Sequence, residues 1–267
     1  MEFTSDENLP VPAYVLIPKG KKGRLPAVVA CHGHGYGSRD IVGLNPDGTE
    51  KTGELGYQKN FALELAKRGF LVIAPEILGF GDRAFPPDLQ TDGSSCARIS
   101  TALFMHGKTM AGARVYDIMR AIDYLSARGD VDAEKIGCMG ISGGGLVCAF
   151  SSAVDERIKA AVVSGYTCTF KESVMSIRHC IDNYIPGILN AAEMPDIIGL
   201  IAPRPLLVES GTEDRWFPVA GTRAAFSRLE KIYGLLGVRD RLEKDIFEGP
   251  HEISGKLAYD WLEKWLM

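Results

Sequence analysis

The sequence lacks several patterns that mark special classes of protein. Its six cysteines form no C-x-x-C pair, and its longest apolar runs, such as residues 70–74, are far too short to span a bilayer. The amino terminus has neither the basic start nor the apolar stretch of a signal peptide. We therefore expect a cytoplasmic protein with reduced cysteines and no membrane segment, although a bridge between Cys168 and Cys180 stays open.

Charge is also balanced. The net charge is −4 and no run of basic residues occurs, so a nucleic-acid partner is not expected. Of 267 residues, 46% are hydrophobic and 24% charged, which suits a globular domain with a substantial core. No repeat or linker divides the chain, and we expect one domain over residues 1–267.

Apolar runs without alternation recur along the chain, with helical patterns between them. Such runs are typical of parallel strands covered on both faces, and their succession predicts an α/β fold with a mostly parallel, doubly wound sheet between two helix layers. The predicted strands are residues 11–18, 26–31, 70–75, 135–141, 158–164, 205–210 and 242–247. The predicted helices are residues 57–68, 114–125, 144–154, 219–233 and 254–266.

Two segments are longer than ordinary connections and mix aromatic, apolar and polar residues. They cover residues 82–111 and 167–200. Excursions of this kind in an α/β enzyme form a lid or pocket wall, and we expect that here. The alternative is a surface elaboration without a role in the site.

The motif Gly140-x-Ser142-x-Gly144 directly follows the predicted strand at 135–141. A sharp strand-to-helix turn lifts a serine oxygen out of the sheet, and small neighbours let strand and helix approach. The motif alone is weakly specific, because a glycine-rich loop fits it as well. Its place at a strand end favours Ser142 as a nucleophile.

A nucleophilic serine needs a base and an acid that orients the base. Among five histidines, His251 follows the last predicted strand and precedes the last helix, so it is expected at the carboxyl edge of the sheet. The acid is expected from the loop after residues 205–210. Asp214 is favoured there, and Glu213 remains an alternative.

The stretch His32-Gly33-His34-Gly35 follows a buried strand and supplies a candidate oxyanion hole. Glycines let backbone amides approach a substrate, and the amides of His34 and Gly143 are the expected donors. A zinc site on His32-x-His34 is disfavoured without a further cluster of ligands. Neither glycine-rich stretch fits a phosphate-binding loop.

Taken together, these residues resemble the α/β-hydrolase superfamily. Ser142, Asp214 and His251 follow its order, and the stretches at 107–112, 120–125 and 131–137 are similar to the dienelactone-hydrolase and acetyl-xylan-esterase group. Dienelactone hydrolases carry a cysteine nucleophile where this chain has serine. The resemblance therefore implies an α/β-hydrolase fold and a serine esterase.

The expected function is hydrolysis of short acyl or acetyl esters through an acyl-enzyme, with no metal or organic cofactor. The expected partner is a small-molecule ester in a site of modest size, while homo-oligomerisation stays open. A prolyl-oligopeptidase-type peptidase, an acyltransferase with the same triad and a non-catalytic interaction module are the alternatives. The expected pocket residues are Tyr36, Phe80, Trp216 and Phe217, with Phe104 and Met105 as further candidates.

Overall fold

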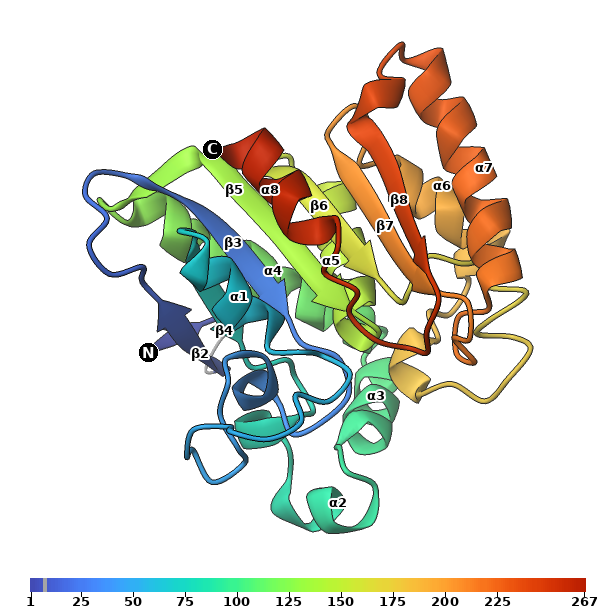
Figure 1. Ribbon diagram of the computed structural model, residues 1–267. Helices are drawn as coiled ribbons and strands as arrows, with labels where there is room; N and C mark the ends of the chain where they lie inside the picture. The colour runs from blue at the N-terminus through green and yellow to red at the C-terminus, as the bar shows by residue number, and fades with distance from the viewer. Residues whose placement is uncertain (7–8) are drawn as a thin grey trace.

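The computed structural model describes residues 1–6 and 9–267. Within them, eight strands form one sheet in the order β1-β2-β4-β3-β5-β6-β7-β8 (Figure 1). β2 runs antiparallel to both of its neighbours, and the pairings from β4 through β8 are parallel. The strands are β1 (Glu2–Thr4), β2 (Pro10–Leu16), β3 (Leu25–Cys31), β4 (Leu71–Pro75), β5 (Val131–Ile141), β6 (Ile158–Ser164), β7 (Leu206–Gly211) and β8 (Leu242–Phe247).

Helices cover both faces of the sheet, as the apolar runs without alternation indicate. Along β3, Val28 and Ala30 belong to the core on one face, whereas Val29 and Cys31 belong to the core on the other. Helices α1 (Phe61–Lys67) and α8 (Ala258–Leu266) cover the first face. The second face carries α4 (Met110–Ala127), α5 (Gly143–Val154), α6 (Met194–Gly199) and α7 (Val219–Leu235). The predicted three-layer α/β-hydrolase fold is confirmed.

The helix predicted over residues 57–68 begins later than expected, at Phe61. Lys59 and Asn60 have φ values of 48° and 51°, so the chain cannot be helical there. Tyr57 and Gln58 therefore lie on a loop beside the sheet's carboxyl edge. The three-residue edge strand β1 has no counterpart among the predicted strands.

Apart from α6, which packs on the second face of the sheet beside α7, the two long excursions lie at the carboxyl edge of the parallel strands (Figure 1). Residues 82–111 contain α2 (Pro86–Thr91) and α3 (Cys96–Met105), and residues 167–200 contain two short 3₁₀ turns and α6. Asp182 of the second excursion is tied to both α4 and the first excursion: its carboxylate accepts a hydrogen bond from Arg114 at 2.5 Å, and Cys96 Sγ lies 3.6 Å from the same oxygen. The excursions are thus fixed to the body of the fold.

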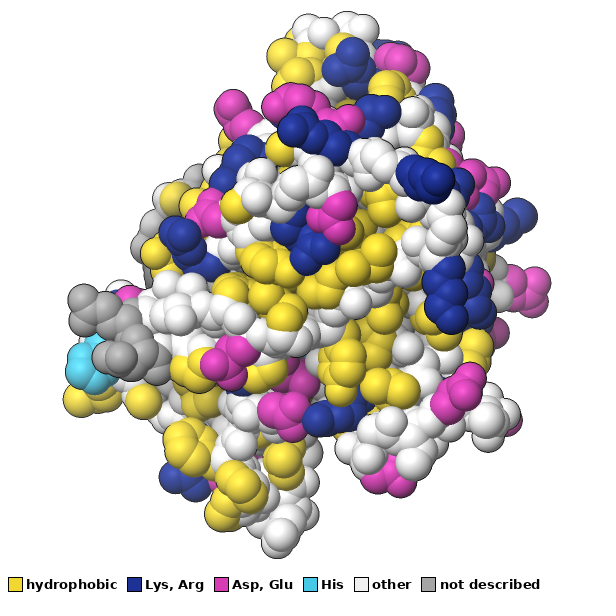
Figure 2. Space-filling view, turned by 90° about the vertical axis from the view of Figure 1, so that its left-hand side faces the viewer, with side chains coloured by type: hydrophobic (Ala, Val, Ile, Leu, Met, Phe, Trp, Pro, Cys, Tyr) yellow, Lys and Arg dark blue, Asp and Glu magenta, His cyan; other side chains and the backbone are white. Residues whose placement is uncertain are grey.

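On one face of the molecule, charged side chains of both signs are mixed. On the side shown in Figure 2, basic and acidic side chains alternate with apolar ones. Across residues 1–6 and 9–267, no helix has the length and apolar character needed to cross a membrane.

Candidate active site

Ser142 lies at the turn between β5 and α5 with φ 58° and ψ −124°, a strained conformation for a residue with a side chain. Close steric contacts require glycine two residues before and two residues after Ser142. A Cβ at Gly140 would lie 2.2 Å from the carbonyl oxygen of Gly144, and one at Gly144 would lie 2.0 Å from that of Cys31. The sequence motif thus encodes a turn in which α5 packs directly on β3.

His251 and Asp214 form a hydrogen-bonded pair from two loops at the same edge. His251 Nδ1 lies 2.7 Å from Asp214 Oδ2. The other carboxylate oxygen accepts hydrogen bonds from the amides of Trp216 at 2.8 Å and Phe217 at 3.0 Å. Asp214 is buried while Glu213 is exposed, so the structure brings Asp214 and not Glu213 to the histidine.

The His251 ring is held between two aromatic rings. Tyr57 stacks on it at 5.6 Å between centroids, and Phe217 stacks on it at 6.0 Å. Gly165 lies against the ring's edge, since a Cβ there would be 2.9 Å from His251 Cε1. His251 Nε2 is buried and has no hydrogen-bond partner in the described part of the chain. That nitrogen is therefore free to accept a proton.

The His32–Gly35 loop lies beside Ser142, and polar contacts fix it. A Cβ on Gly33 would be 3.2 Å from Ser142 Cβ, and one on Gly143 would be 3.1 Å from His34 Nδ1. The Gly33 amide donates to Gln58 Oε1 at 2.6 Å, and the Tyr57 hydroxyl donates to the His34 carbonyl at 2.6 Å. The residues predicted for the oxyanion hole are thus neighbours of the serine.

One cavity of about 1220 Å³ contains these groups. Ser142, Gly143, His34 and His251 line it, together with residues from both excursions. The aromatic part of the cavity wall includes Phe104, Trp216 and Phe217. The polar part includes Asp92, Ser94, Arg178 and Asn183. The expectation of a modest site is wrong, because this volume exceeds the roughly 300–1,000 Å³ of ordinary ligand pockets.

Comparison with known proteins agrees with this architecture. The sequence pattern of the Abhydrolase family matches residues 2–230. The provisionally described hydrolase YtaP of Bacillus subtilis (strain 168) is 31% identical over 270 residues, covering 96% of this chain and 83% of that protein. The chain belongs to the Abhydrolase family.

This α/β-hydrolase is also similar to solved esterase structures. A Bacteroides fragilis NCTC 9343 protein, provisionally described as an acetyl xylan esterase, superposes with a TM-score of 0.82 at 18% identity over 98% of this chain and 77% of its own. The glucuronoyl esterase of Solibacter usitatus superposes with a TM-score of 0.67 at 19% identity, covering 96% and 76%. These similarities show that the fold is shared.

Two predicted pocket residues of the hydrolase lie elsewhere. The Tyr36 hydroxyl donates to the Leu44 carbonyl at 3.0 Å, and Tyr36 does not line the cavity. Phe80 is 1% exposed and packs edge-on against the ring of His34 at 5.0 Å. Their positions after predicted strands correctly place both residues near the carboxyl edge of the sheet, but they do not determine which way each ring points. Trp216, Phe217 and Phe104 do line the cavity, whereas Met105 is 88% exposed and does not.

The contacts of His32 and His34, the disfavoured zinc pair, hold their rings apart. His32 is fully buried; its Nδ1 lies 2.8 Å from the Gly33 carbonyl and its Nε2 accepts from the Ile77 amide at 3.0 Å. His34 points instead toward Asp182, so the two rings do not converge on one ion. Cys168 and Cys180 are both free thiols.

Sequence reasoning missed the charged group behind His34. Asp182 is fully buried, and burial would raise its pKa, but Arg114 and His34 outweigh that effect and bring the pKa to about 2. Burial lowers the pKa of the His34 imidazole, which the Asp182 carboxylate only partly offsets. A lone Arg and a lone Asp 68 residues apart give no sequence signal, because only the packing of α4 against the second excursion joins them.

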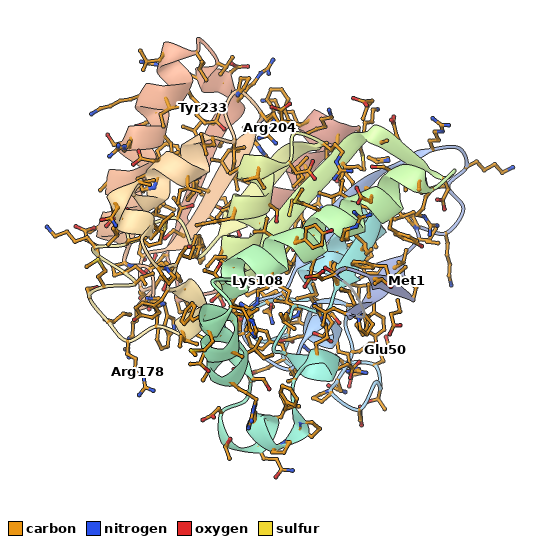
Figure 3. All side chains as sticks on the ribbon, turned by 180° about the vertical axis from the view of Figure 1, so that it is seen from behind. Met1, Glu50, Lys108, Arg178, Arg204 and Tyr233 are labelled. Carbon is orange, nitrogen blue, oxygen red and sulfur yellow. The ribbon has the colours of Figure 1, made fainter. Side chains whose placement is uncertain are left out.

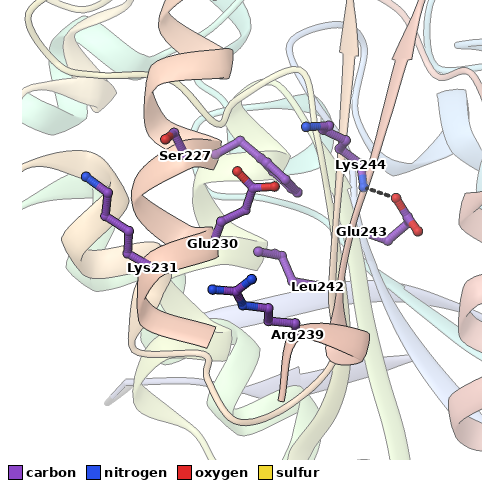
Figure 4. A pocket seen from close by; sticks show the side chains of 8 residues that line it. Ser227, Glu230, Lys231, Arg239, Leu242, Glu243 and Lys244 are labelled. Carbon is purple, nitrogen blue, oxygen red and sulfur yellow. Dashed lines mark hydrogen bonds between the residues drawn. The ribbon is translucent and has the colours of Figure 1, made fainter. Parts of the chain in front are cut away.

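A second hollow of about 390 Å³ lies between α7 and β8 (Figure 4). It is lined by charged side chains of both signs, including Glu230, Lys231 and Arg239. Leu242, at the start of β8, also lines it, so it opens at the end of the parallel strands opposite His251. It contains no paired nucleophile and base, and the cavity at Ser142 is the better candidate.

Proposed function

We propose that this α/β-hydrolase is a serine carboxylic-ester hydrolase with Ser142 as nucleophile, His251 as general base and Asp214 as the acid that orients it. The observation that carries the proposal is the His251–Asp214 bond of 2.7 Å, with Nε2 unpaired in a cavity that Ser142 also lines. The strained turn at Ser142 supports it, since strain of this kind concentrates at functional sites.

In the proposed reaction Ser142 Oγ attacks the ester carbonyl while its proton passes to His251 Nε2. Asp214 keeps the Nδ1 proton facing the carboxylate and stabilises the imidazolium. The amides of Gly143 and His34 donate to the oxyanion, each contributing about 3 kcal/mol to the barrier reduction. His251 then protonates the leaving alcohol and activates a water that releases the acid.

The favoured substrates are short acyl esters of a bulky, sugar-like alcohol. An acetyl group fills only a small part of a cavity of about 1220 Å³, so most of the volume is left for the alcohol. Exposed aromatic surface from Trp216, beside the polar groups of Asp92, Ser94 and Asn183, suits rings that are apolar on one face and hydroxylated at the edge. A carbohydrate esterase of an unknown prokaryotic organism, MZ0003, is 25% identical over 142 residues, 47% of this chain and 33% of that protein, which supports the choice.

The test compares acetylated oligosaccharides with chromogenic acetyl and long-acyl esters. We expect turnover of the acetylated sugars and of the chromogenic acetate, and loss of both in Ser142→Ala. Ser176→Ala, an exposed serine outside the cavity, is the matched control and should keep full activity. Retained hydrolysis by Ser142→Ala would overturn the assignment. Product analysis with an added alcohol separates hydrolysis from acyl transfer, because both pass through one acyl-enzyme.

A further inference from the structure

Four metal-binding side chains meet in the wall of the cavity: His34, Cys96, Cys180 and Asp182. Each offers one ligand atom, and these atoms all lie within 4.8 Å of one another. They come from the loop after β3, the start of α3 and the segment around the first 3₁₀ turn of the second excursion. Only the tertiary fold brings them together.

From this juxtaposition we infer a binding site for one thiophilic divalent cation of the zinc class. Two sulfurs, an imidazole nitrogen and a carboxylate oxygen form a four-membered donor set of the type that holds tetrahedral zinc. Harder cations such as magnesium and calcium prefer oxygen ligands and do not suit two thiolates.

The distances are close to those of a tetrahedral site. His34 Nε2 lies 3.7 Å from Asp182 Oδ2, and Cys96 Sγ lies 3.6 Å from the same oxygen. Neighbouring donors around tetrahedral zinc are about 3.3–3.8 Å apart, given metal–ligand bonds of about 2.0–2.3 Å. Since no pair is separated by more than 4.8 Å, the site closes with movements of about 1.5 Å or less. His34 Nε2 is buried and has no hydrogen-bond partner in the described chain, so it is free to ligate.

Arg114 balances the charge of the site. Its guanidinium bonds Asp182 at 2.5 Å and lies 3.2 Å from Cys96 Sγ, and it is itself 1% exposed. Two thiolates and one carboxylate carry three negative charges. A divalent cation and the guanidinium together carry three positive charges, so the occupied cluster is neutral in a buried place where a net charge is costly.

The ion reaches the cluster through the cavity, which His34, Cys96 and Cys180 line together with Ser142. The cluster lies next to Gly143, the residue after Ser142, because a Cβ on Gly143 would lie 4.0 Å from Asp182 Oδ2. Four protein ligands leave no open coordination position, so the bound ion is not a Lewis acid for the ester. It instead fixes His34 and narrows the cavity beside Ser142, which lowers ester hydrolysis; this consequence rests on the proposed function.

The direct test is Co²⁺ titration of the full-length protein, freed of metal and kept reduced. We expect one equivalent to produce a thiolate-to-cobalt charge-transfer band, which Zn²⁺ then abolishes by displacement. Cys96→Ser and Cys180→Ser should each reduce the band by about half or more and bind Zn²⁺ at least about 100-fold more weakly, since even outer partners of a metal ligand contribute 10- to 100-fold, and the double variant should lose the band. Cys168→Ser, a buried free thiol outside the cluster, should keep the band.

The spectroscopic readout is independent of catalysis, so it decides the metal site whether or not the ester substrate is right. A wild-type protein without the band, or single variants that keep it at full intensity, would overturn the inference. Cys180 is only partly buried, so Cys180→Ser tests the site if Cys96→Ser folds poorly. If the protein hydrolyses the ester, added Zn²⁺ should lower the hydrolysis rate of the wild-type protein. The rate of the Cys96→Ser/Cys180→Ser double variant should not change with Zn²⁺.

Discussion

At the scale of single residues, the site depends on which member of a chemically similar pair faces inward. Glu213 and Asp214 are adjacent acids, yet only Asp214 is buried, with both of its oxygens hydrogen-bonded. The sequence favours Asp214 by its place in the turn after Gly211, but Glu213 remains an alternative because it is an adjacent acid of the same chemistry. The bond to His251 forms only where the tertiary fold brings the two loops together, so the sequence around Asp214 does not reveal it.

Asp214→Asn tests that bond. The asparagine amide would present a donor to His251 Nδ1 and favour the wrong tautomer, so we expect kcat for a chromogenic acetate to fall roughly 10⁴-fold. Glu213→Gln is the matched control and should stay within twofold of wild type. A similar loss in both variants would mean that the loop, and not this carboxylate, matters.

Glu209, within β7, is a second buried acid in contact with the site's framework. It accepts hydrogen bonds from the Ser164 hydroxyl at 2.7 Å and the Gly255 amide at 2.8 Å. Burial raises its pKa to about 7. The folded state therefore holds this proton more tightly than the unfolded chain does, and the contribution of Glu209 to stability falls as pH rises from about 4.5 through 7.

Glu209→Gln mimics the neutral acid and should remove that fall. Each pKa unit corresponds to about 1.4 kcal/mol. When the pH is raised from 4.5 to 8, the wild-type protein should therefore lose up to about 3 kcal/mol of unfolding free energy that the variant does not lose. Urea unfolding at both pH values measures it. A difference between the two proteins that does not change with pH would contradict the raised pKa.

At the scale of elements, the strands could be predicted and the loops could not. Apolar runs without alternation predict β3 to β7 because both faces of those strands are buried along most of their length, whereas the edge strand β8 is exposed at Glu243 and Lys244. The sequence predicts helix over the loop bearing Tyr57, since the left-handed residues Lys59 and Asn60 have no glycine to mark them. The role of Tyr57, which stacks on His251 and holds the His34 loop, therefore has no sequence signal.

The contact between α5 and β3 is the element-scale feature most open to mutation. Gly144→Ala would place a Cβ 2.0 Å from the Cys31 carbonyl and 2.5 Å from that of His32, both backbone atoms that cannot rotate away. We expect a loss of about 3 kcal/mol in the free energy of unfolding, measured in urea. Gly129→Ala, where no atom lies within 4 Å of the added carbon, should change stability by less than about 0.5 kcal/mol. Equal effects at the two positions would refute the close approach.

At the scale of the whole molecule, the two excursions turn a common fold into a particular enzyme site. The segments at 82–111 and 167–200 were expected to form pocket walls, and residues from both line the cavity. Arg178 extends from the second excursion toward solvent (Figure 3), at the cavity's outer side. The predicted size was wrong because volume depends on how far the excursions stand from the sheet, which composition does not encode.

The order and strand-end positions of Ser142, Asp214 and His251 could be read from the sequence, because the chain emerges at the same edge of the sheet after each parallel strand. The buried Arg114–Asp182 pair and the four-ligand cluster beside it could not, since their members are single residues in separate segments. Site residues that follow a strand are predictable here, and those brought in by irregular segments are not.

The central claim is that Ser142 is an activated nucleophile, and fluorophosphonate labelling followed by peptide mass spectrometry tests it most directly. The reagent phosphonylates a serine whose proton a neighbouring base removes, with loss of fluoride. We predict a single adduct on Ser142 in the wild-type protein, strongly slowed labelling in Asp214→Asn, and none in a folded Ser142→Ala. An unlabelled Ser142, or equal labelling of wild type and Ser142→Ala at another residue, would contradict the account.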